Sequence, residues 1–509
     1  MLLTVMLDLL GHAERIAQHV ADLPVDGRYF GCVPRAYVVG GFVRDMVMGI
    51  ASKDMDIEVY GVSPEVLQDL LAGMFPRLDV VGVSFGVLKV FLEDGGEIDI
   101  SLPRREQKQG RGHKGFYIDA DPALGVAEAT RRRDFTMNAI LYDPLTREYV
   151  DPFSGVRDIA DGVLRVVDAA TFVEDPLRVL RAVQFVGRFG LRLDGVSREL
   201  LIDMVDRGEL AELSAERVTT ELEKLFLLSP KPSQGFICAL ELGVVEKLWP
   251  ELYATIDTPQ NPAWHPEGDV WIHTMMVIDE AAKIIRREHM SRHDGLVLMC
   301  ATLCHDYGKP LVTKLIDGVI RSPGHSEAGV APARAWFARL SFHASIARTV
   351  AILIREHLQP AQLFWAYQKG ELHDRTYGLA LRRLVRRLGD VSPDMLLWCA
   401  EADMRGRGLP YNPTPHELFR ELVVRYDVVR DVATPLVTGA DVIALLDVEE
   451  GPIVGEILRA VEDARDTGTV STREEAIDYI LNIYPTIIPT STAKPPIKNM
   501  RAAPRKSDV

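Results

Sequence analysis

The stretch VVGGFVRDMVMGIASKDMDIEVYG, residues 38–61, decides the fold of the N-terminal part of this chain. A β-branched run leads into Gly40 and Gly41, and an apolar helical pattern carrying Arg44 and Asp45 follows. Adjacent glycines at a strand-to-helix turn let backbone N–H groups approach a phosphate, and an arginine one turn later can pair with it. Taken alone, this segment is explained better by a purely structural turn.

The strand that ends the same stretch changes that interpretation, because it carries two acids. Asp54 and Asp56 are two positions apart, so both carboxylates are predicted to project from one face of the strand. Neighbouring anions repel each other and need a cation. Mg²⁺ accepts one or two carboxylates together with phosphate oxygens, and two such ions would activate a hydroxyl and stabilise a pyrophosphate leaving group. An isolated D-x-D is usually a surface feature, but its place after G-G-x-x-R-D favours a metal site.

The elements around this stretch predict a small α/β domain followed by helices. The segment VLKVFLEDGGEIDIS reads as a hairpin, SPEVLQDLLAGMF as a capped helix, and MLLTVMLDLLGHAERI as an amphipathic helix and not a signal peptide. Helical patterns dominate from about residue 155, and Pro-rich breaks at 258–266 and 408–417 bracket a block rich in His and Asp. A later helix is predicted to open with a capping box of Ser471 and Glu474.

These patterns predict an α+β protein with five segments. We expect a head domain at 1–152, a helical neck domain at 153–257, an all-α domain at 258–410, a helical C-terminal domain at 411–484 and a disordered tail at 485–509.

The bulk composition limits the classes of function. Apolar residues make up 47% and charged residues 26%, as in a soluble globular protein, and no apolar run is long enough to span a membrane. The five cysteines are scattered and odd in number, which favours a reducing cytoplasm. A net charge of −15 argues against a protein that coats nucleic acid. The basic segment RREQKQGRGHK (104–114) fits a solvated loop and a nucleic-acid contact equally well.

Three strings in this order resemble bacterial tRNA CCA-adding enzymes and their poly(A) polymerase relatives, whose head domain is of the polymerase-β type. They are residues 38–61, RRRDFTMNAI (131–140) and EDPLRVLRAVQF (174–185). The resemblance implies that Gly40, Gly41 and Arg44 belong to the nucleotide site, that Arg133 contacts the nucleotide and that Asp134 supports the site.

The third string also has a physical interpretation. Asp175, Arg178 and Arg181 are successive i,i+3 neighbours, so they are predicted to share one helix face. A surface ion-pair ladder is the simpler alternative. A rigid carboxylate and guanidinium would accept cytosine and adenine and reject uracil and guanine, because a mispaired buried polar group costs about 1–3 kcal/mol. The resemblance implies that Asp175 and Arg178 act as an amino-acid template and that Arg181 is a further nucleotide contact; Gln184 occupies a position where many relatives have arginine.

The sequence does not settle the roles of two further features. Residues 103–130 resemble the family's mobile loop, which implies a part in switching from C to A addition. Asp99 is a possible third carboxylate, since many such polymerases have one there, although relatives often lack it.

A second group of residues predicts another metal site. His273 lies in a helical stretch, His305 and Asp306 end an apolar helix, and Asp403 follows in EADMRGR. Imidazole and carboxylate ligands together suit Mn²⁺, Fe²⁺, Ni²⁺, Zn²⁺ or Mg²⁺. The order resembles the HD phosphohydrolase superfamily, and specifically the HD domain fused to CCA-adding enzymes, which implies phosphatase or 2′,3′-cyclic phosphodiesterase activity. His325 and His357 are spaced like the extra ligands of two-metal members.

The resemblance therefore implies a cytoplasmic CCA-adding enzyme that uses CTP, ATP and Mg²⁺ on tRNA, without a membrane partner, as a monomer or homodimer. An A-adding enzyme or poly(A) polymerase shares these motifs, although poly(A) polymerases of this group usually lack the HD block. A nucleotide hydrolase whose polymerase half only holds RNA is a third hypothesis, and retention of Asp54 and Asp56 argues against it.

Overall fold

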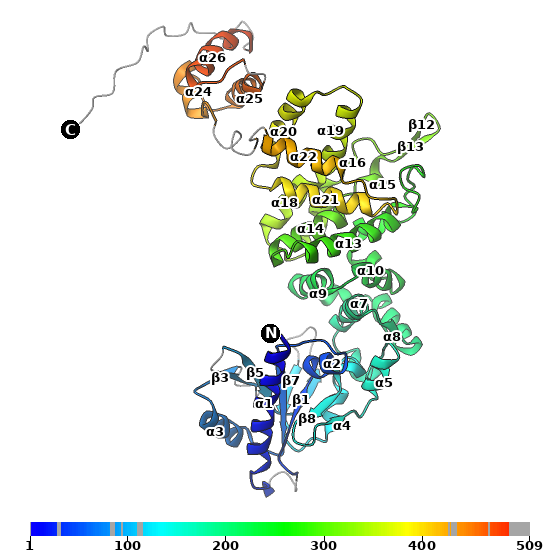
Figure 1. Cartoon of the computed structure of the whole chain (residues 1–509). Helices are drawn as coiled ribbons and strands as arrows, with labels where there is room; N and C mark the ends of the chain where they lie inside the picture. The colour runs from blue at the N-terminus through cyan, green and yellow to red at the C-terminus, as the bar shows by residue number, and fades with distance from the viewer. Residues whose placement is uncertain are drawn as a thin grey trace, which may run out of the picture. The chain divides into compact units, whose positions relative to one another are not determined.

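The structure, a computed structural model, describes residues 2–27, 32–81, 87–92, 95–108, 116–425, 428, 435–466 and 469–487 (Figure 1). The chain forms two compact units, residues 1–351 with 405–409, and residues 352–404 with 410–509. Within the described residues, no helix combines the length and the apolar character that crossing a bilayer requires. The tail was predicted at residues 485–509, but residues 485–487 belong to helix α26 (Arg473–Ile487), and residues 488–509 lie outside the described residues.

The head of the first unit is built on a seven-stranded sheet with strand order β3-β4-β5-β2-β1-β8-β9. Its strands are β1 (Arg35–Val39), β2 (Met55–Tyr60), β3 (Arg77–Val81), β4 (Val87–Phe91), β5 (Glu97–Ser101), β8 (Leu141–Asp143) and β9 (Glu148–Val150). β4 and β5 pair in antiparallel register, which confirms the predicted hairpin. β6 (Arg104–Lys108) and β7 (Phe116–Ala120) form a separate ribbon, and residues 109–114 of the basic segment lie outside the described residues.

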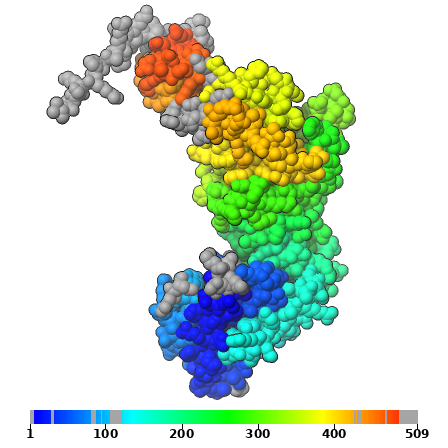
Figure 2. All heavy atoms as spheres, viewed as in Figure 1, coloured from blue at the N-terminus to red at the C-terminus, as the bar shows by residue number. Residues whose placement is uncertain are grey.

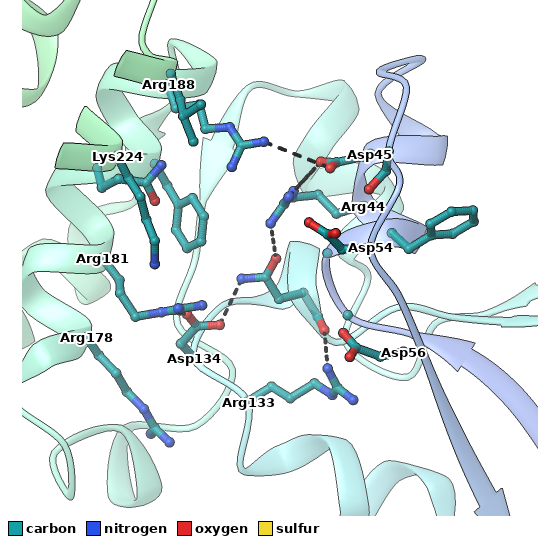
Figure 3. A pocket seen from close by; sticks show the side chains of 18 of the residues that line it. Arg44, Asp45, Asp54, Asp56, Arg133, Asp134, Arg178, Arg181, Arg188 and Lys224 are labelled. Atoms are coloured by element: carbon teal, nitrogen blue, oxygen red, sulfur yellow. Dashed lines mark hydrogen bonds and ion pairs between the residues drawn. The ribbon is translucent and has the colours of Figure 1, made fainter. Parts of the chain in front are cut away.

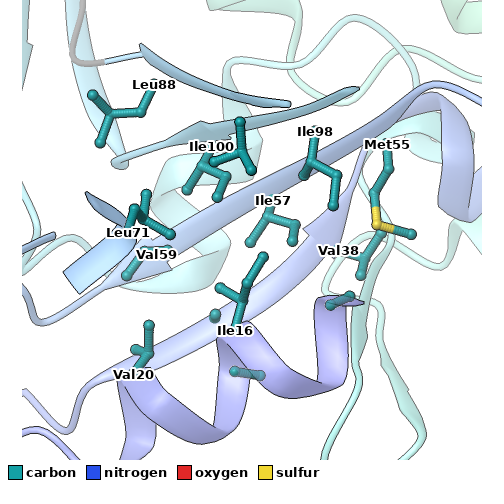
Figure 4. Packing of buried hydrophobic residues seen from close by; sticks show 14 of the residues in the cluster. Ile16, Val20, Val38, Met55, Ile57, Val59, Leu71, Leu88, Ile98 and Ile100 are labelled. Carbon is teal, nitrogen blue, oxygen red and sulfur yellow. The ribbon is translucent and has the colours of Figure 1, made fainter. Parts of the chain in front are cut away.

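Helix α1 (Leu2–Ala21) packs on this sheet, and its presence confirms the predicted amphipathic helix. Ile16 and Val20 of α1 are fully buried in one apolar cluster with the strand residues Ile57 and Val38 (Figure 4). The other helices of the head are α2 (Gly41–Val47), α3 (Pro64–Met74), α4 (Val126–Arg131) and α5 (Gly155–Ala160). Figure 2 shows the head, coloured blue to cyan, as a closely packed body that continues into the helices of the neck.

The neck that follows is helical, with one two-residue strand pair, β10 (Val163–Leu164) with β11 (Arg192–Leu193). Its helices are α6 (Ala169–Phe172), α7 (Leu177–Phe189), α8 (Gly195–Asp206), α9 (Ala215–Leu228), α10 (Pro232–Glu241), α11 (Val244–Leu248) and α12 (Pro250–Tyr253). Glycines allow three of them to pack closely. A Cβ added at Gly235 of α10 would lie 2.4 Å from Leu225 Cδ1 of α9 and 2.9 Å from the Val183 carbonyl oxygen of α7. These helices therefore support one another at a fixed, short separation.

The remainder of the first unit consists of helices and one short hairpin. These elements are α13 (Val270–Arg287), α14 (Arg292–Cys304), α15 (Lys309–Val312), β12 (Lys314–Ile316), β13 (Val319–Arg321), α16 (His325–Ala328), α17 (Val330–Ala338) and the start of α18 (Ala344–Glu356). Cys300 and Cys304 of α14 are fully buried.

The second unit is helical in its described residues. It contains α19 (Gln359–Gln368), α20 (Asp374–Leu388), α21 (Pro393–Arg405), α22 (Thr414–Arg425), α24 (Gly439–Leu446), α25 (Pro452–Asp466) and α26 (Arg473–Ile487). α24, α25 and α26 share a small apolar core of their own around Val442, Ile457 and Ile480.

Three local predictions need correction. β2 begins at Met55, so Asp54 precedes the strand, because β1 ends at Val39 opposite Asp56 and offers no further partner. Asp175 precedes α7, which begins at Leu177. The helix α26 is capped by Thr472 and Glu475 and not by Ser471 and Glu474, since the Glu475 N–H donates to Thr472 Oγ1 and Glu475 accepts from the Thr472 N–H.

Candidate nucleotidyl-transfer and metal sites

A cavity of about 820 Å³ lies between the head and the neck (Figure 3). Every residue predicted for the nucleotide site lines it, namely Gly40, Gly41, Arg44, Asp54, Asp56, Arg133, Asp134, Asp175, Arg178 and Arg181. Nine lining side chains are Arg or Lys and five are Asp. The cavity is therefore cationic although the chain is acidic, which suits polyanionic ligands.

The carboxylates of Asp54 and Asp56 lie on the head side of the cavity (Figure 3). Burial raises the pKa of Asp56 to about 6, and the charges of Asp99 and Asp54 add to this effect while Arg133 opposes it. Gly40 closes the turn beside them with φ 75°, and a Cβ there would lie 3.2 Å from Asp56 Oδ2. Only glycine adopts this backbone readily, so the turn and the carboxylate depend on each other.

Asp99, whose role as a third carboxylate is not settled by the sequence, lies beside Asp56. β2 and β5 run parallel, with Asp56 and Asp99 directly opposite each other. Lys89 Nζ lies 3.4 Å from Asp99 Oδ1 and 2.7 Å from Glu97 Oε2. Asp99 is thus close enough to influence Asp56, but it is not among the residues that line the cavity.

A continuous chain of polar contacts crosses the cavity from α2 to α7. Arg44 donates to Asp45 Oδ1 from Nε and Nη2 at 2.8 and 2.6 Å, and from Nη1 to Asn138 Oδ1 at 2.9 Å. Asn138 Nδ2 donates to Asp134 Oδ1 at 2.9 Å, and Arg181 Nε donates to Asp134 Oδ2 at 2.6 Å. Burial would raise the pKa of Asp134, but Arg181 and Asn138 outweigh it and the pKa is lowered. Asp134 therefore remains charged and orients Arg181.

The predicted template residues are held by fixed partners. Asp175 accepts two hydrogen bonds from Arg217 Nη2, at 2.8 and 3.1 Å, and a third from the Leu177 N–H at 3.1 Å. Arg178 donates to the carbonyl oxygens of Thr171 and Arg132 at 2.7 and 2.8 Å. This anchoring provides the rigidity that selection between bases requires.

Several residues that line the cavity were not predicted. Arg217, Lys224 and Leu228 come from α9, Arg188 from the end of α7, and Asn138 from the short helix at Thr136–Asn138. Asn138 could have been noticed, because it belongs to the RRRDFTMNAI string. The α9 residues carry no local signal, since only helix packing brings them to the cavity.

The second predicted site has Asp306 at its centre within the first unit. Asp306 is buried, and three imidazole Nε2 atoms face its carboxylate, those of His305 at 3.1 Å, His325 at 3.4 Å and His273 at 3.8 Å. Lys309 Nζ lies 2.6 Å from Asp306 Oδ2. Burial would raise the pKa of Asp306, but His305 and Lys309 hold it well below the ordinary value.

The Nδ1 atom of each of these histidines is bound to the protein. His305 Nδ1 donates to the Thr302 carbonyl oxygen at 2.7 Å and His325 Nδ1 to that of Ser322 at 2.8 Å. His273 Nδ1 lies 2.7 Å from Glu267 Oε1. Such bonds fix the tautomer that presents Nε2 as a ligand, so the donor set fits a divalent metal.

A neighbouring group of residues was not predicted. Glu267 Oε1 also lies 2.9 Å from His265 Nδ1, and the ligand atoms of His265, Glu267 and His273 lie within 4.8 Å of one another. The hydrogen bonds from the two histidines overcome the effect of burial and lower the pKa of Glu267 to about 2. The string HPEG before His273 was the available signal.

The two remaining predicted ligands belong to the second unit. His357 follows α18 and is buried, with Nδ1 donating to the Ile354 carbonyl oxygen at 2.6 Å, and Asp403 is buried on α21. Their roles as ligands stay predictions.

Three protein families match successive parts of the chain. Residues 36–165 match the Poly A polymerase head domain, residues 190–255 the probable RNA and SrmB-binding site of polymerase A, and residues 270–391 the HD domain. The matches cover the head side of the cavity and most of the predicted metal ligands, in the order that the motifs indicated. Residues 174–185, the third string, lie between the first two matches.

Curated relatives span most of the chain. It is 38% identical over 379 residues to a multifunctional CCA protein of Xanthomonas campestris pv. campestris, covering 73% of this chain and 85% of the relative. The multifunctional CCA protein of Stenotrophomonas maltophilia is 38% identical over 378 residues, covering 73% and 86%.

Solved structures show the same fold. The Bacillus stearothermophilus CCA-adding enzyme in complex with CTP has a TM-score of 0.59 at 22% identity, covering 93% of this chain and 97% of that one. The Thermotoga maritima CCA-adding enzyme complexed with tRNA has a TM-score of 0.54 at 19% identity, covering 94% and 98%. The chain belongs to the family of bacterial CCA-adding tRNA nucleotidyltransferases that carry a fused HD domain.

Proposed function

We propose that this enzyme builds and repairs the 3′-terminal CCA of tRNA from CTP and ATP. The observation that carries the proposal is one cationic cavity in which the carboxylates of Asp54 and Asp56 face the anchored pair Asp175 and Arg178. In the reaction, the 3′ hydroxyl of the RNA attacks the α-phosphorus of the nucleotide, and pyrophosphate leaves.

The chain's own residues position the nucleotide. Arg178 and the Asp175 carboxylate meet the amino-bearing edge of cytosine or adenine, while Arg133 and Arg181 contact the rest of the nucleotide. Gly40 and Gly41 let the backbone approach the phosphates. Asp54 and Asp56 would hold Mg²⁺, which when bound supplies charge neutralisation at the reacting phosphate.

Incubation with tRNA that ends at the discriminator base, offered each nucleotide singly and then in combination, tests this function. We expect two C from CTP alone, a following A once ATP is present, and no extension from UTP or GTP. Incorporation of A alone would instead identify an A-adding enzyme or a poly(A) polymerase. Sequencing of the products separates these results.

We also propose that the HD domain is a metal-dependent phosphohydrolase. His273, His305 and Asp306 would be ligands together with Asp403, with His325 and His357 as further ligands if two ions bind; the metal is a transition metal or Mg²⁺. A bound metal supplies an activated water and a Lewis acid. Release of phosphate from 2′- or 3′-nucleotides, or opening of 2′,3′-cyclic nucleotides, after chelation and reloading with each metal tests the activity. No hydrolysis with any metal would contradict it.

The remaining predictions concern the whole protein. A cytoplasmic location, a monomeric or homodimeric state, the five domain ranges and a role for residues 103–130 in the switch from C to A stay proposals. Analytical ultracentrifugation measures the oligomeric state directly.

A further inference from the structure

The neck side of the cavity carries polar residues that the nucleotide assignments leave unused. Gln184 and Arg188 come from α7 and Lys224 from α9, and all three line the cavity. Figure 3 shows Arg188 and Lys224 together on the neck side, across the cavity from Asp54. Template-independent transfer brings two polyanions into one cavity, the nucleotide and the end of the RNA. Because the nucleotide assignments do not use these three residues, they are available to bind the RNA end.

Gln184 is a buried donor in need of an acceptor. Its side chain is 1% exposed, and its Nε2 has no hydrogen-bond partner among the residues that the structure describes. Buried polar groups are almost always hydrogen-bonded, because an unsatisfied donor is costly. A ligand in the cavity supplies the missing acceptor.

The positive charge of Arg188 is only partly neutralised by its neighbouring carboxylate. Its Nη2 lies 3.9 Å from Asp45 Oδ2, beyond hydrogen-bond distance, and Asp45 already accepts both of its short bonds from Arg44. Burial and the neighbouring charge of Arg44 lower the pKa of Arg188. An anion placed here relieves this unfavourable environment.

The ammonium group of Lys224 has more N–H donors than its hydrogen bond to Glu221 uses. Its Nζ donates to Glu221 Oε1 at 2.7 Å, and its side chain is 39% exposed. An ammonium carries three N–H donors, so two of them remain for a second acceptor. Arg188 and Lys224 together can therefore bind a phosphate group from two sides.

The position along the chain indicates which phosphate is bound. Lys224 lies within residues 190–255, the segment that matches a probable RNA-binding family, and Arg188 immediately precedes that segment. The nucleotide already has Arg44, Arg133 and the template pair near the carboxylates.

We propose that Gln184, Arg188 and Lys224 form the subsite for the 3′-terminal nucleotide of the RNA. Arg188 and Lys224 bind its phosphate, and the Gln184 amide donates a hydrogen bond to the same nucleotide, which directs the 3′ hydroxyl toward Asp54 and Asp56. This inference rests on the proposed tRNA-extending function.

The test uses the full-length enzyme and a tRNA that lacks CCA. Arg188→Gln and Lys224→Gln each remove one charge at similar size, and each is expected to raise KM for the tRNA by about tenfold while KM for CTP changes less than about twofold. In anisotropy titrations at increasing KCl, the slope of log K against log salt falls by about 0.7–0.9 for each of these variants. Gln184→Leu raises KM for the tRNA as well but leaves the salt slope unchanged, because the lost donor is neutral.

Two control variants separate this role from general effects. Arg207→Gln removes the same charge from the neck outside the cavity, so its effect on KM for the tRNA must be clearly smaller. Lys224→Arg keeps the charge and restores tRNA affinity, which a folding defect in Lys224→Gln would not explain. Melting temperatures of all variants accompany the kinetics.

The outcomes distinguish the inference from the proposed function. A wild-type enzyme that does not extend tRNA contradicts the proposed function itself. If the wild type is active but the variants raise KM for CTP instead, the site binds the triphosphate, and the inference is wrong. Equal tRNA affinity and equal salt slopes in wild type and variants also overturn it.

Discussion

Asp56, which we propose as a metal ligand, shows at the level of one residue how burial changes a carboxyl group. Its carboxyl has a pKa of about 6 in the folded protein, against an ordinary value of 3.8. Between pH 3.8 and about 6, the metal-free folded state therefore holds a proton that the unfolded chain has released. This contribution to stability is complete below pH 3.8 and is lost as the pH rises through 6. Metal binding removes the penalty at neutral pH.

We therefore predict opposite effects of Asp56→Asn on activity and on metal-free stability. Nucleotide incorporation falls by about a thousandfold, because several kcal/mol of transition-state stabilisation are lost. Without metal at pH 7.5, the melting temperature of the variant is equal to or higher than that of the wild type. Mg²⁺ raises the melting temperature of the wild type more than that of the variant. Calorimetry with and without EDTA measures both, and equal Mg²⁺ stabilisation would contradict the assigned ligand.

Gly40→Ala is expected to impair the same site through its backbone. The added Cβ would lie 3.2 Å from Asp56 Oδ2 and 3.3 Å from Arg133 Nη1 at a φ of 75°. We expect a stability loss of about 1–3 kcal/mol and a strong loss of incorporation. Gly49→Ala is the matched control, since Gly49 has φ 70° and no atom within 4 Å of its added Cβ. Its variant should be destabilised but remain active, and equal activity losses in both would contradict the role of Gly40.

The residues with chemical roles were the easiest to predict from the sequence. Gly40, Asp56 and Arg181 belong to strings in which glycine, charge and spacing are jointly constrained, and all three line one cavity. Arg217 and Lys224 could not be found in this way. Their roles depend on the packing of α9 against α7, which no local pattern encodes.

At the level of elements, the helices α7, α9 and α10 of the neck pack closely together where glycines lie at their contacts. Gly187 of α7 and Gly235 of α10 both face Leu225 Cδ1, at 2.5 and 2.4 Å from their added Cβ atoms. The close approach leaves no room for a methyl group. The positions of Arg181, Arg188 and Lys224 depend on this packing.

We predict that Gly235→Ala destabilises the neck by about 1–3 kcal/mol through overpacking. Leu225→Ala alone leaves a void and costs about 2–5 kcal/mol. The double variant should lose less than the sum of the two, because the new methyl group enters the space that Leu225 leaves. Urea unfolding of all four proteins measures this coupling, and strict additivity would show that the two sites do not interact.

Element boundaries were less predictable than element types. Asp54 lies just before β2 and Asp175 just before α7, although both were expected inside regular structure. For β2, strand pairing decides where the element begins, whereas for α7 a proline in the local sequence does. β1 ends at Val39 and leaves Asp54 without a ladder partner, and Pro176 occupies the position before the first residue of α7.

At the scale of the whole molecule, the two predicted chemistries use separate residues. Asp306→Asn should abolish phosphate release by the HD domain and leave CCA addition within about twofold of the wild type. Asp56→Asn should have the reverse effect. Assays of both activities on both variants, with metal content measured, provide the comparison. Loss of both activities in either variant would mean that the two sites are coupled.

The order of the matched families agreed with the motif order, because each motif group defines a module of its own. The ligand environment of the HD domain was harder to predict. His265 and Glu267 are separated from Asp306 by a full helical hairpin, so only the folded chain shows how they support His273.

Helix α1 has a practical consequence for any shortened form of this enzyme. It precedes residue 36, where the family match begins, yet Ile16 and Val20 contribute fully buried side chains to the core of the head. A protein expressed from residue 36 would retain every motif, but Val38 and Ile57 would lose an apolar cover. Such a protein would expose apolar surface of the head and would therefore aggregate. The part of the chain that carries the motifs is thus shorter than the part that the head needs in order to fold.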